Sequence, residues 1–200
     1  MKKSQFIKKV LKERPSFRNI DTFFFIEPFE HILCGFFCEI TPRGAYVWKF
    51  VYPLFDRFDC LSLLYSERLV YPEGYIDFAN VDRTNLASEF VSRTNKFIES
   101  AHQYLKLEQF CELYSRRPDL LKHERAEMTL GYSYILLGKK ELANKHLISA
   151  LEYLREPALS ECQNILSLLD IDIEEAKLGV LQLEQVMKKN IGLEVSNLKS

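Results

Sequence analysis

Cysteine and histidine side chains in the N-terminal third have the chemistry of metal ligands. His31, Cys34 and Cys38 lie close together, and Cys60 follows as a fourth candidate. Structural zinc sites use closely paired ligands on turns. Here the first three lie in one apolar segment typical of a strand, in which side chains alternate, so His31 points away from the two cysteines. We therefore expect buried thiols and no metal.

A cysteine nucleophile with a histidine base is the second chemistry that the residue types allow. The candidates are Cys34, Cys38, Cys60 and Cys111, with His31, His102, His123 and His146. No motif of a Cys–His enzyme surrounds them, and nothing indicates a lowered thiol pKa. The five cysteines are odd in number and scattered through apolar segments, which makes a poor disulfide framework. Reduced, buried thiols favour a cytoplasmic protein.

Carboxylates can act as acid–base pairs where their surroundings separate their pKa values. The candidates are Glu27, Glu30, Glu39, Asp56, Asp59 and Glu67. We expect Glu39 to form a cross-strand ion pair with Lys49, and Asp56, Arg57 and Asp59 to form an ordinary loop. The sequence contains no glycine-rich phosphate loop or dinucleotide fingerprint. We predict no catalytic residue and no cofactor.

Composition excludes several classes of protein. Hydrophobic residues make up 47% and charged residues 28% of the 200 residues, which supports a packed core and argues against disorder. The net charge of -1 argues against nucleic acid as a partner. No apolar run is long enough for a secretory signal or a membrane span. The basic start, Lys2 to Arg18, could contact an acidic partner or nucleic acid, but the near-neutral total charge favours a solvated helix face.

The N-terminal half has the pattern of a small antiparallel sheet. A short helix, capped by Ser4, is expected before Pro15. The predicted strands are Thr22–Ile26, His31–Ile40, Ala45–Tyr52 and Cys60–Tyr65. The sequence Thr-Pro-Arg-Gly at 41–44 predicts a hairpin turn between the second and third strands, because Pro fixes one φ angle and Gly tolerates a positive one.

The third predicted strand is strongly aromatic on one face. Tyr46, Trp48, Phe50 and Tyr52 share that face through the two-residue period of a strand. Two interpretations remain open. In the first, the rings stack on nucleic-acid bases or fill a protein interface, since such side chains concentrate binding energy. In the second, they pack beneath a helix predicted at Leu86–Ala101.

Beyond about residue 115 the chain is rich in Leu, Ala, Glu and Lys, which favour helices. A short helix is expected at Leu107–Tyr114, and Arg116-Arg117-Pro118 marks a domain boundary. The expected fold is α+β. An antiparallel sheet covered by helices fills residues 1–117, and an all-helical domain fills residues 118–200.

One motif stands out between Glu124 and Pro157. Large and small residues recur there at fixed spacing, and the residues that define the motif are Leu130, Gly131, Tyr134, Gly138, Ala143, Leu147 and Ala150. Glycine and alanine let two helices approach closely, and Gly138 suits the end of the first helix. This segment resembles a single tetratricopeptide repeat, a helical hairpin of about 34 residues. It departs from the pattern at Glu127, usually apolar, and at Arg155, usually proline.

The resemblance implies a scaffold that binds other proteins. A single repeat cannot bury its own face, so the helices predicted at Leu159–Leu169 and Ile173–Met187 are expected to support it. We therefore predict a cytoplasmic, non-catalytic protein-binding module. One concrete version is a bacterial inhibitor or immunity-type protein that binds a toxin. The alternatives are an enzyme with a pocket between sheet and helices, and a self-associating domain that forms a homodimer.

Overall fold

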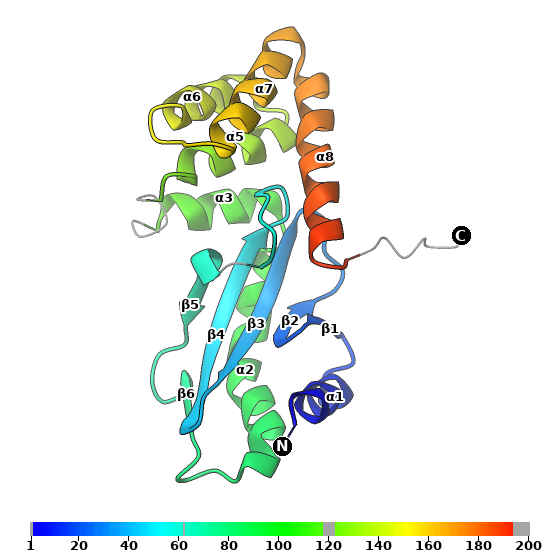
Figure 1. Cartoon of the computed structure of the whole chain (residues 1–200), viewed down its shortest axis with the longest axis vertical. Coiled ribbons are helices and arrows are strands. Elements are labelled where there is room, and N and C mark those ends of the chain that lie inside the picture. The colour runs from blue at the N-terminus through cyan, green and yellow to red at the C-terminus, as the bar shows by residue number, and fades with distance from the viewer. Residues whose placement is uncertain (1, 62, 118–122, 194–200) are drawn as a thin grey trace, which may run out of the picture. The chain divides into compact units, whose positions relative to one another are not determined.

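The computed structural model describes residues 2–61, 63–117 and 123–193, and the fold is α+β as predicted (Figure 1). The chain divides into two compact units. The sheet unit is Met1–Tyr52 with Ser62–Leu105, and the helical unit is Pro53–Leu61 with Lys106–Ser200. The division therefore differs from the predicted boundary after residue 117. Pro118, which suggested that boundary, lies outside the described residues.

The sheet unit contains an antiparallel sheet. Its strands are β1 (Phe17–Ile20), β2 (Phe23–Ile26), β3 (Ile32–Ile40), β4 (Gly44–Pro53), β5 (Ser66–Arg68) and β6 (Tyr75–Asp77). In the described part of the chain the order is β1-β2-β3-β4-β5, and β6 also pairs with β4. The predicted hairpin turn is present, since the Thr41 amide donates to the Gly44 carbonyl at 2.8 Å. The long strands β3 and β4 form the centre of the sheet.

Two predictions about the sheet are wrong. The expected strand at Cys60–Tyr65 is replaced by a 3-10 turn at Leu63–Tyr65, and the strand follows at Ser66–Arg68. Residues 60–65 contain no β-branched side chain, which weakens their preference for a strand. The expected ion pair between Glu39 and Lys49 does not form, because Lys49 pairs with another carboxylate. Lys49 lies opposite Glu67 on β5 and pairs with it at 3.3 Å.

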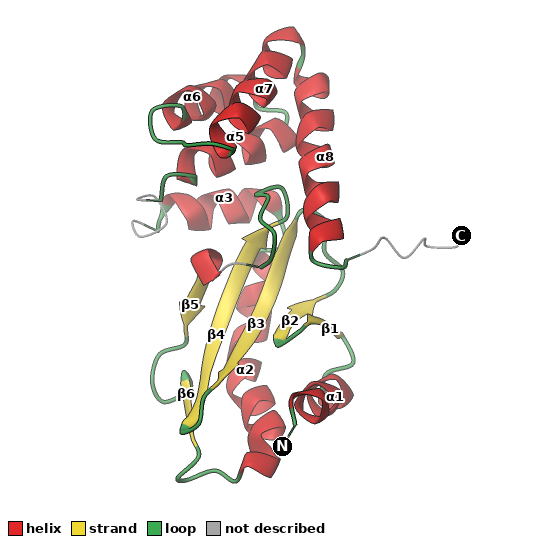
Figure 2. Ribbon diagram, in the orientation of Figure 1, coloured by secondary structure: helices red, strands yellow, loops and turns green. Residues whose placement is uncertain are grey.

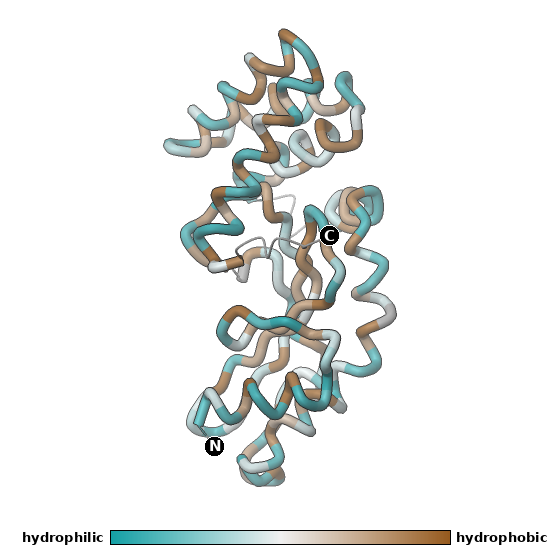
Figure 3. Tube along the Cα trace, turned by 90° about the vertical axis from the view of Figure 1, so that its right-hand side faces the viewer, coloured by the Kyte–Doolittle hydropathy of each residue, from teal (hydrophilic) through white to brown (hydrophobic). Residues whose placement is uncertain are grey.

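Two helices pack on one face of this sheet. They are α1 (Lys3–Glu13) and α2 (Leu86–Gln103), which follows the 3-10 turn Arg83–Asn85. Phe6 of α1, Phe24 of β2 and Phe90 of α2 form a cluster of rings whose centroids lie 5.4 to 5.7 Å apart. Figure 3 shows the hydrophilic and hydrophobic residues that alternate along α1, beside the N mark. The predicted cap at Ser4 is wrong, because α1 begins at Lys3 and its N-cap is Lys2, two residues before Ser4.

In its described residues the helical unit contains helices and no strand of its own (Figure 2). They are α3 (Leu107–Ser115), α5 (Ala126–Leu136), α6 (Lys140–Ala150), α7 (Ala158–Ile171) and α8 (Ile173–Asn190). Helices α5 and α6 form one antiparallel hairpin, α7 and α8 form a second, and α5 also packs on α8. The Asp172 side chain caps α8 by accepting from the Ile173 amide at 2.7 Å.

Candidate protein-binding face

Neighbouring residues of β2 show which face of the sheet the helices cover. Phe24 is fully buried beneath α2, with its ring 5.4 Å from that of Phe90. Phe23 points to the opposite face, where it stacks on Phe37 at 4.3 Å and meets Phe50 edge-on at 5.5 Å. Side chains alternate along a strand, so α1 and α2 cover only one face of the sheet. In Figure 1, α2 runs behind β3 and β4.

The face opposite α2 carries a row of half-buried rings with charged groups between them. We call it the open face, and it consists of Phe23, Phe37, Glu39, Tyr46, Trp48, Arg68 and Tyr75. Strand register places these residues together, because Tyr46 pairs with Tyr75 on β6 and Trp48 pairs with Arg68 on β5. The Tyr46 and Tyr75 rings lie 5.0 Å apart. The row therefore continues across β2, β3, β4 and β6.

A cation and a carboxylate lie beside the same indole ring on the open face. The guanidinium carbon of Arg68 lies 3.9 Å from the Tyr46 ring centroid and 5.0 Å from that of Trp48. The Trp48 indole donates a hydrogen bond to Glu39 Oε2 at 3.0 Å. Within the described residues, neither Arg68 nor Glu39 forms an ion pair. Arg68 is exposed and Glu39 is half-buried, so both charges are accessible to a binding partner.

The four aromatic residues predicted for β4 share one face, but they differ in exposure. Tyr46 and Trp48 are half-buried. Phe50 and Tyr52 are buried, with relative exposures of 2% and 1%, and Tyr52 packs edge-on against Tyr65 at 5.2 Å. Of the four predicted interface residues, therefore, only Tyr46 and Trp48 are accessible.

The alternative in which the aromatic row packs beneath the helix at Leu86–Ala101 is wrong. The residues of β4 that face α2 are those between the aromatic ones, and Ala45 and Val47 are both fully buried there. Ala45 lies opposite Ile76 of β6, which is also fully buried. On this side of the sheet α2 packs against β3 and β6, and the Phe24 and Phe90 rings lie between α2 and the sheet.

The motif residues of the helical unit lie where α5 meets α6. Leu130, Ala143, Leu147 and Ala150 are buried, and Gly131 faces α6. A Cβ atom at Gly131 would lie 2.5 Å from Leu147 Cδ2 and 2.6 Å from its Cγ, so only glycine fits without a shift. Gly138 follows α5 with φ +71°, a conformation that side chains disfavour.

Tyr134, the remaining motif residue, is half-buried beside His146 of α6. Their rings stack with centroids 5.2 Å apart, and His146 Nδ1 lies 2.7 Å from Glu127 Oε2. Glu127 departs from the repeat pattern, and here it holds the histidine against the tyrosine ring. The polar Glu127 side chain therefore fits at the edge of the α5–α6 hairpin, where it contacts His146.

A pocket of about 370 Å³ adjoins Tyr134 in the helical unit. It is lined by Glu108, Gln109, Cys111, Glu112, Ser115, Tyr134, Leu137 and Lys139. Burial raises the pKa of the Cys111 thiol to about 11 and also raises the pKa of the Tyr134 hydroxyl. Both groups are therefore protonated at neutral pH, and Cys111 lacks the thiolate that a nucleophile needs.

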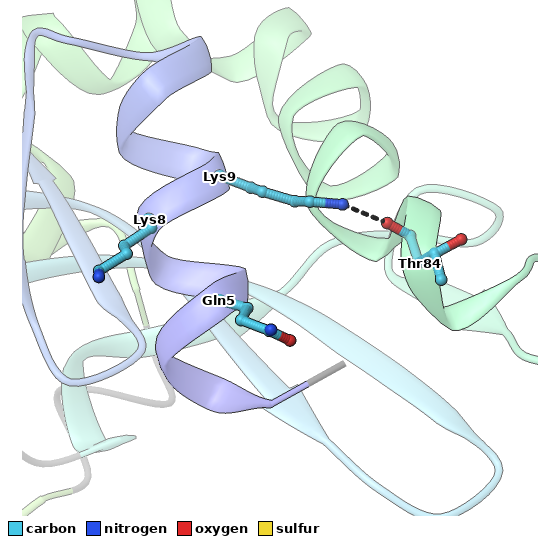
Figure 4. Close-up of a pocket in the computed structure, with 4 residues that line it drawn as sticks. All are labelled: Gln5, Lys8, Lys9 and Thr84. Carbon is cyan, nitrogen blue, oxygen red and sulfur yellow. Dashed lines mark hydrogen bonds between the residues drawn. The ribbon is translucent and has the colours of Figure 1, made fainter.

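A second pocket, of about 360 Å³, lies beside α1 in the sheet unit (Figure 4). It is lined by Gln5, Lys8, Lys9 and Thr84, and Lys9 Nζ donates to the Thr84 carbonyl at 3.0 Å. Lys8 and Lys9 are exposed, as the interpretation of the basic start as a solvated helix face predicts. This pocket offers ammonium and amide groups but no carboxylate.

The segment that follows β4 lies in the helical unit and is held there by charged contacts. Asp56 is fully buried, and Arg125, before α5, donates to its carboxylate through Nε at 2.7 Å. Arg57 pairs with Glu161 of α7 at 3.3 Å. The Phe58 ring lies 4.7 Å from the Arg125 guanidinium carbon. Sequence reasoning interpreted this segment as an ordinary loop.

Burial dominates the electrostatics around this segment. The pKa of Glu161 is raised chiefly by burial, although Arg57 and Arg125 act to lower it. Tyr132 of α5 is fully buried, and burial also raises its pKa, with a smaller contribution from Glu161. Its hydroxyl makes no hydrogen bond within the described residues. The cluster fixes the segment in place and holds no accessible acid–base pair.

The cysteines considered as metal ligands differ in exposure. Cys34 and Cys38 are buried, and burial raises the pKa of both thiols, whereas Cys60 is exposed. In the part of the chain that the structure describes, no group of three or more His, Cys, Asp or Glu side chains is placed to hold a metal ion. No described helix has the length and apolar character needed to cross a membrane.

No similar protein was found. Comparison with protein-family models, with curated proteins and with solved structures gave no match. The resemblance to a tetratricopeptide repeat therefore stays a prediction.

Proposed function

We propose that the chain is a non-catalytic protein-binding module and that the open face is its binding surface. The observation that supports this most strongly is the half-buried aromatic row around Tyr46 and Trp48, with Arg68 stacked over both rings. Trp, Tyr and Arg are the residues that contribute most binding energy at protein interfaces. A row of half-buried rings on the face that α1 and α2 leave open can anchor a partner.

The geometry of Arg68 supports a preformed site. Its guanidinium already lies over two rings, so binding a partner loses little of the side-chain freedom that a flexible arginine would lose. The indole of Trp48 is held in turn by Glu39. Three of the side chains that a partner would contact are thus positioned before it arrives.

The other candidate sites offer less. The pocket beside Tyr134 contains a protonated thiol in Cys111, and the pocket beside Lys9 contains no carboxylate. Neither provides a nucleophile with an adjacent base. The narrower hypothesis of an inhibitor that binds a toxin stays a prediction, as does cytoplasmic location.

Photo-cross-linking tests the proposed surface directly. A photoreactive phenylalanine analogue replaces Tyr46 on the open face and, in a control variant, Tyr153, which is 58% exposed in the helical unit. Both are irradiated in the native host cells. We expect a discrete protein adduct at position 46 that is lost when Trp48→Ala is added, and no such adduct at position 153. Absence of any adduct at position 46, or an adduct that Trp48→Ala leaves unchanged, would overturn the proposal.

A further inference from the structure

Charge on the open face is self-complementary. Trp48 on this face contacts one accessible cation, Arg68, and one accessible carboxylate, Glu39. Neither has an ion-pair partner within the described residues. Resting on the proposed function, we propose that the protein bound by the open face is a second copy of this chain, in a two-fold symmetric dimer.

Two-fold symmetry satisfies both charges at once. When a surface meets its own copy across a two-fold axis, residue i contacts residue j and residue j contacts residue i. With Trp48 near the axis, Arg68 of each copy faces Glu39 of the other. The contact occurs twice, and both charges that lack an ion-pair partner in the single chain gain one. The rings of Tyr46 and Trp48 are then enclosed between the two pairs.

Partners that carry charge of a single sign satisfy only one of the two charges. Nucleic acid or an acidic protein segment would match Arg68 but would bring negative charge against Glu39. A basic segment would match Glu39 and meet Arg68. A buried charge left without a partner costs binding energy. The net charge of each chain is only -1, so two copies repel each other weakly at long range.

The aromatic row supplies the apolar contact that such a dimer needs. Phe23, Phe37, Tyr46, Trp48 and Tyr75 are all half-buried in the single chain. Sheets that pack face to face lie about 10 Å apart with interdigitated side chains. Half-buried rings on both surfaces can fill that space, and the fully desolvated centre of the contact is where Trp and Tyr contribute most.

A charge-swap experiment on the purified full-length protein tests this arrangement. Arg68→Glu and Glu39→Arg are prepared separately, and mass is measured by light scattering over a wide range of concentration. We expect the wild type to reach twice the 23.5 kDa of the chain. Each variant alone places like charges together at both contacts, so its dissociation constant should rise at least about tenfold.

Mixing the two variants should restore the dimer. In the mixed pair, the carboxylate introduced at position 68 faces the guanidinium introduced at position 39, and native Glu39 faces native Arg68. Arg155→Glu and Glu152→Arg make the same charge changes at exposed positions of the helical unit and should leave the wild-type mass unchanged. Circular dichroism confirms that every variant is folded.

The outcomes separate this inference from the proposed function. A wild type that stays monomeric, or a mixture that behaves like its separate components, overturns the second-copy assignment. In that case, an adduct of another protein at position 46 would still support the open face as a binding surface. An adduct with the mass of two chains supports both proposals, and absence of any adduct at position 46 overturns both.

Discussion

Asp56 and Arg125 are 69 residues apart in the sequence and form a buried ion pair within the helical unit, with Arg125 Nε 2.7 Å from Asp56 Oδ1. The side-chain exposures of Asp56 and Arg125 are 0% and 10%. Removing either charge of such a pair is costly, because the other charge stays buried after this partner is lost. The segment after β4 is therefore an integral part of the helical unit.

Removing one partner of this pair should destabilise the protein strongly. We expect Asp56→Ala to lower the free energy of unfolding by about 3–5 kcal/mol, since it leaves the Arg125 charge buried. Urea unfolding followed by circular dichroism measures the change. Asp59→Ala, in the same segment but exposed, is the control and should change stability by less than about 0.5 kcal/mol. Equal effects of the two substitutions would contradict the assigned role of the pair.

Glu161 should make stability depend on pH in the opposite sense to an ordinary ion-paired carboxylate. Burial raises its pKa above the ordinary value of 4.5 in the folded state. The folded protein therefore binds this proton more tightly than the unfolded chain does, and stability is lost as pH rises from 4.5 through the folded pKa. Glu161→Gln should remove that loss and be neutral or stabilising at pH 7.

Chemical unfolding at a series of pH values measures this effect, with exposed Glu152→Gln as the control. The control should leave the pH profile of the wild type unchanged. Should Glu161→Gln instead destabilise the protein at pH 7, the ion pair with Arg57 would outweigh the cost of burial.

Local signals in the sequence predicted much of the fold. Pro42 and Gly44 marked the β3–β4 hairpin, and the alternation along β4 showed that its aromatic residues share a face. The hydrophobic period predicted α2, and Gly138 marked the end of α5. Each of these signals acts within a few residues of the chain, so the structure it specifies can be predicted without knowledge of distant contacts.

Packing between elements that are distant in the sequence could not be predicted in the same way. Alternation showed that β4 has two faces, but the more aromatic face is not the one under α2. The covered face combines small Ala45 and Val47 with Phe24 and Phe90 from other elements. Likewise, nothing local in the segment around Asp56 indicates a partner as distant as Arg125. The residues of the open face could be identified only from the register of β5 and β6 against β4, which the sequence does not show.

The two faces of the sheet should respond differently to truncation. Phe24→Ala removes a fully buried ring beneath α2 and should cost about 3–5 kcal/mol of stability. Tyr46→Ala removes a half-buried ring from the open face and should cost about 1 kcal/mol or less. Thermal unfolding of the two variants compares them. Similar losses of stability would mean that the open face is part of the core.

Gly131 should tolerate even a methyl group poorly. A Cβ there would meet both Cδ2 and the branch-point Cγ of buried Leu147, so Gly131→Ala should cost about 1–3 kcal/mol despite the better helix propensity of alanine. Gly179→Ala in α8 is the matched control. Its Cβ would meet only the ends of Ile165 and Leu168, at 2.7 and 2.9 Å, and these can rotate away. Denaturant unfolding should show a smaller loss for Gly179→Ala, and the reverse order would contradict close α5–α6 packing at Gly131.

Quenching of Trp48 fluorescence tests the open face most directly, because Trp48 is the only tryptophan in the chain. Acrylamide quenching is measured in the dilute protein alone and again in the complex, formed either by concentrating the chain or by adding the protein captured at position 46. We predict that complex formation lowers the quenching constant of Trp48 several-fold and shifts its emission to shorter wavelength. A complex that forms while Trp48 remains as quenchable as in the free chain would show that partners bind elsewhere.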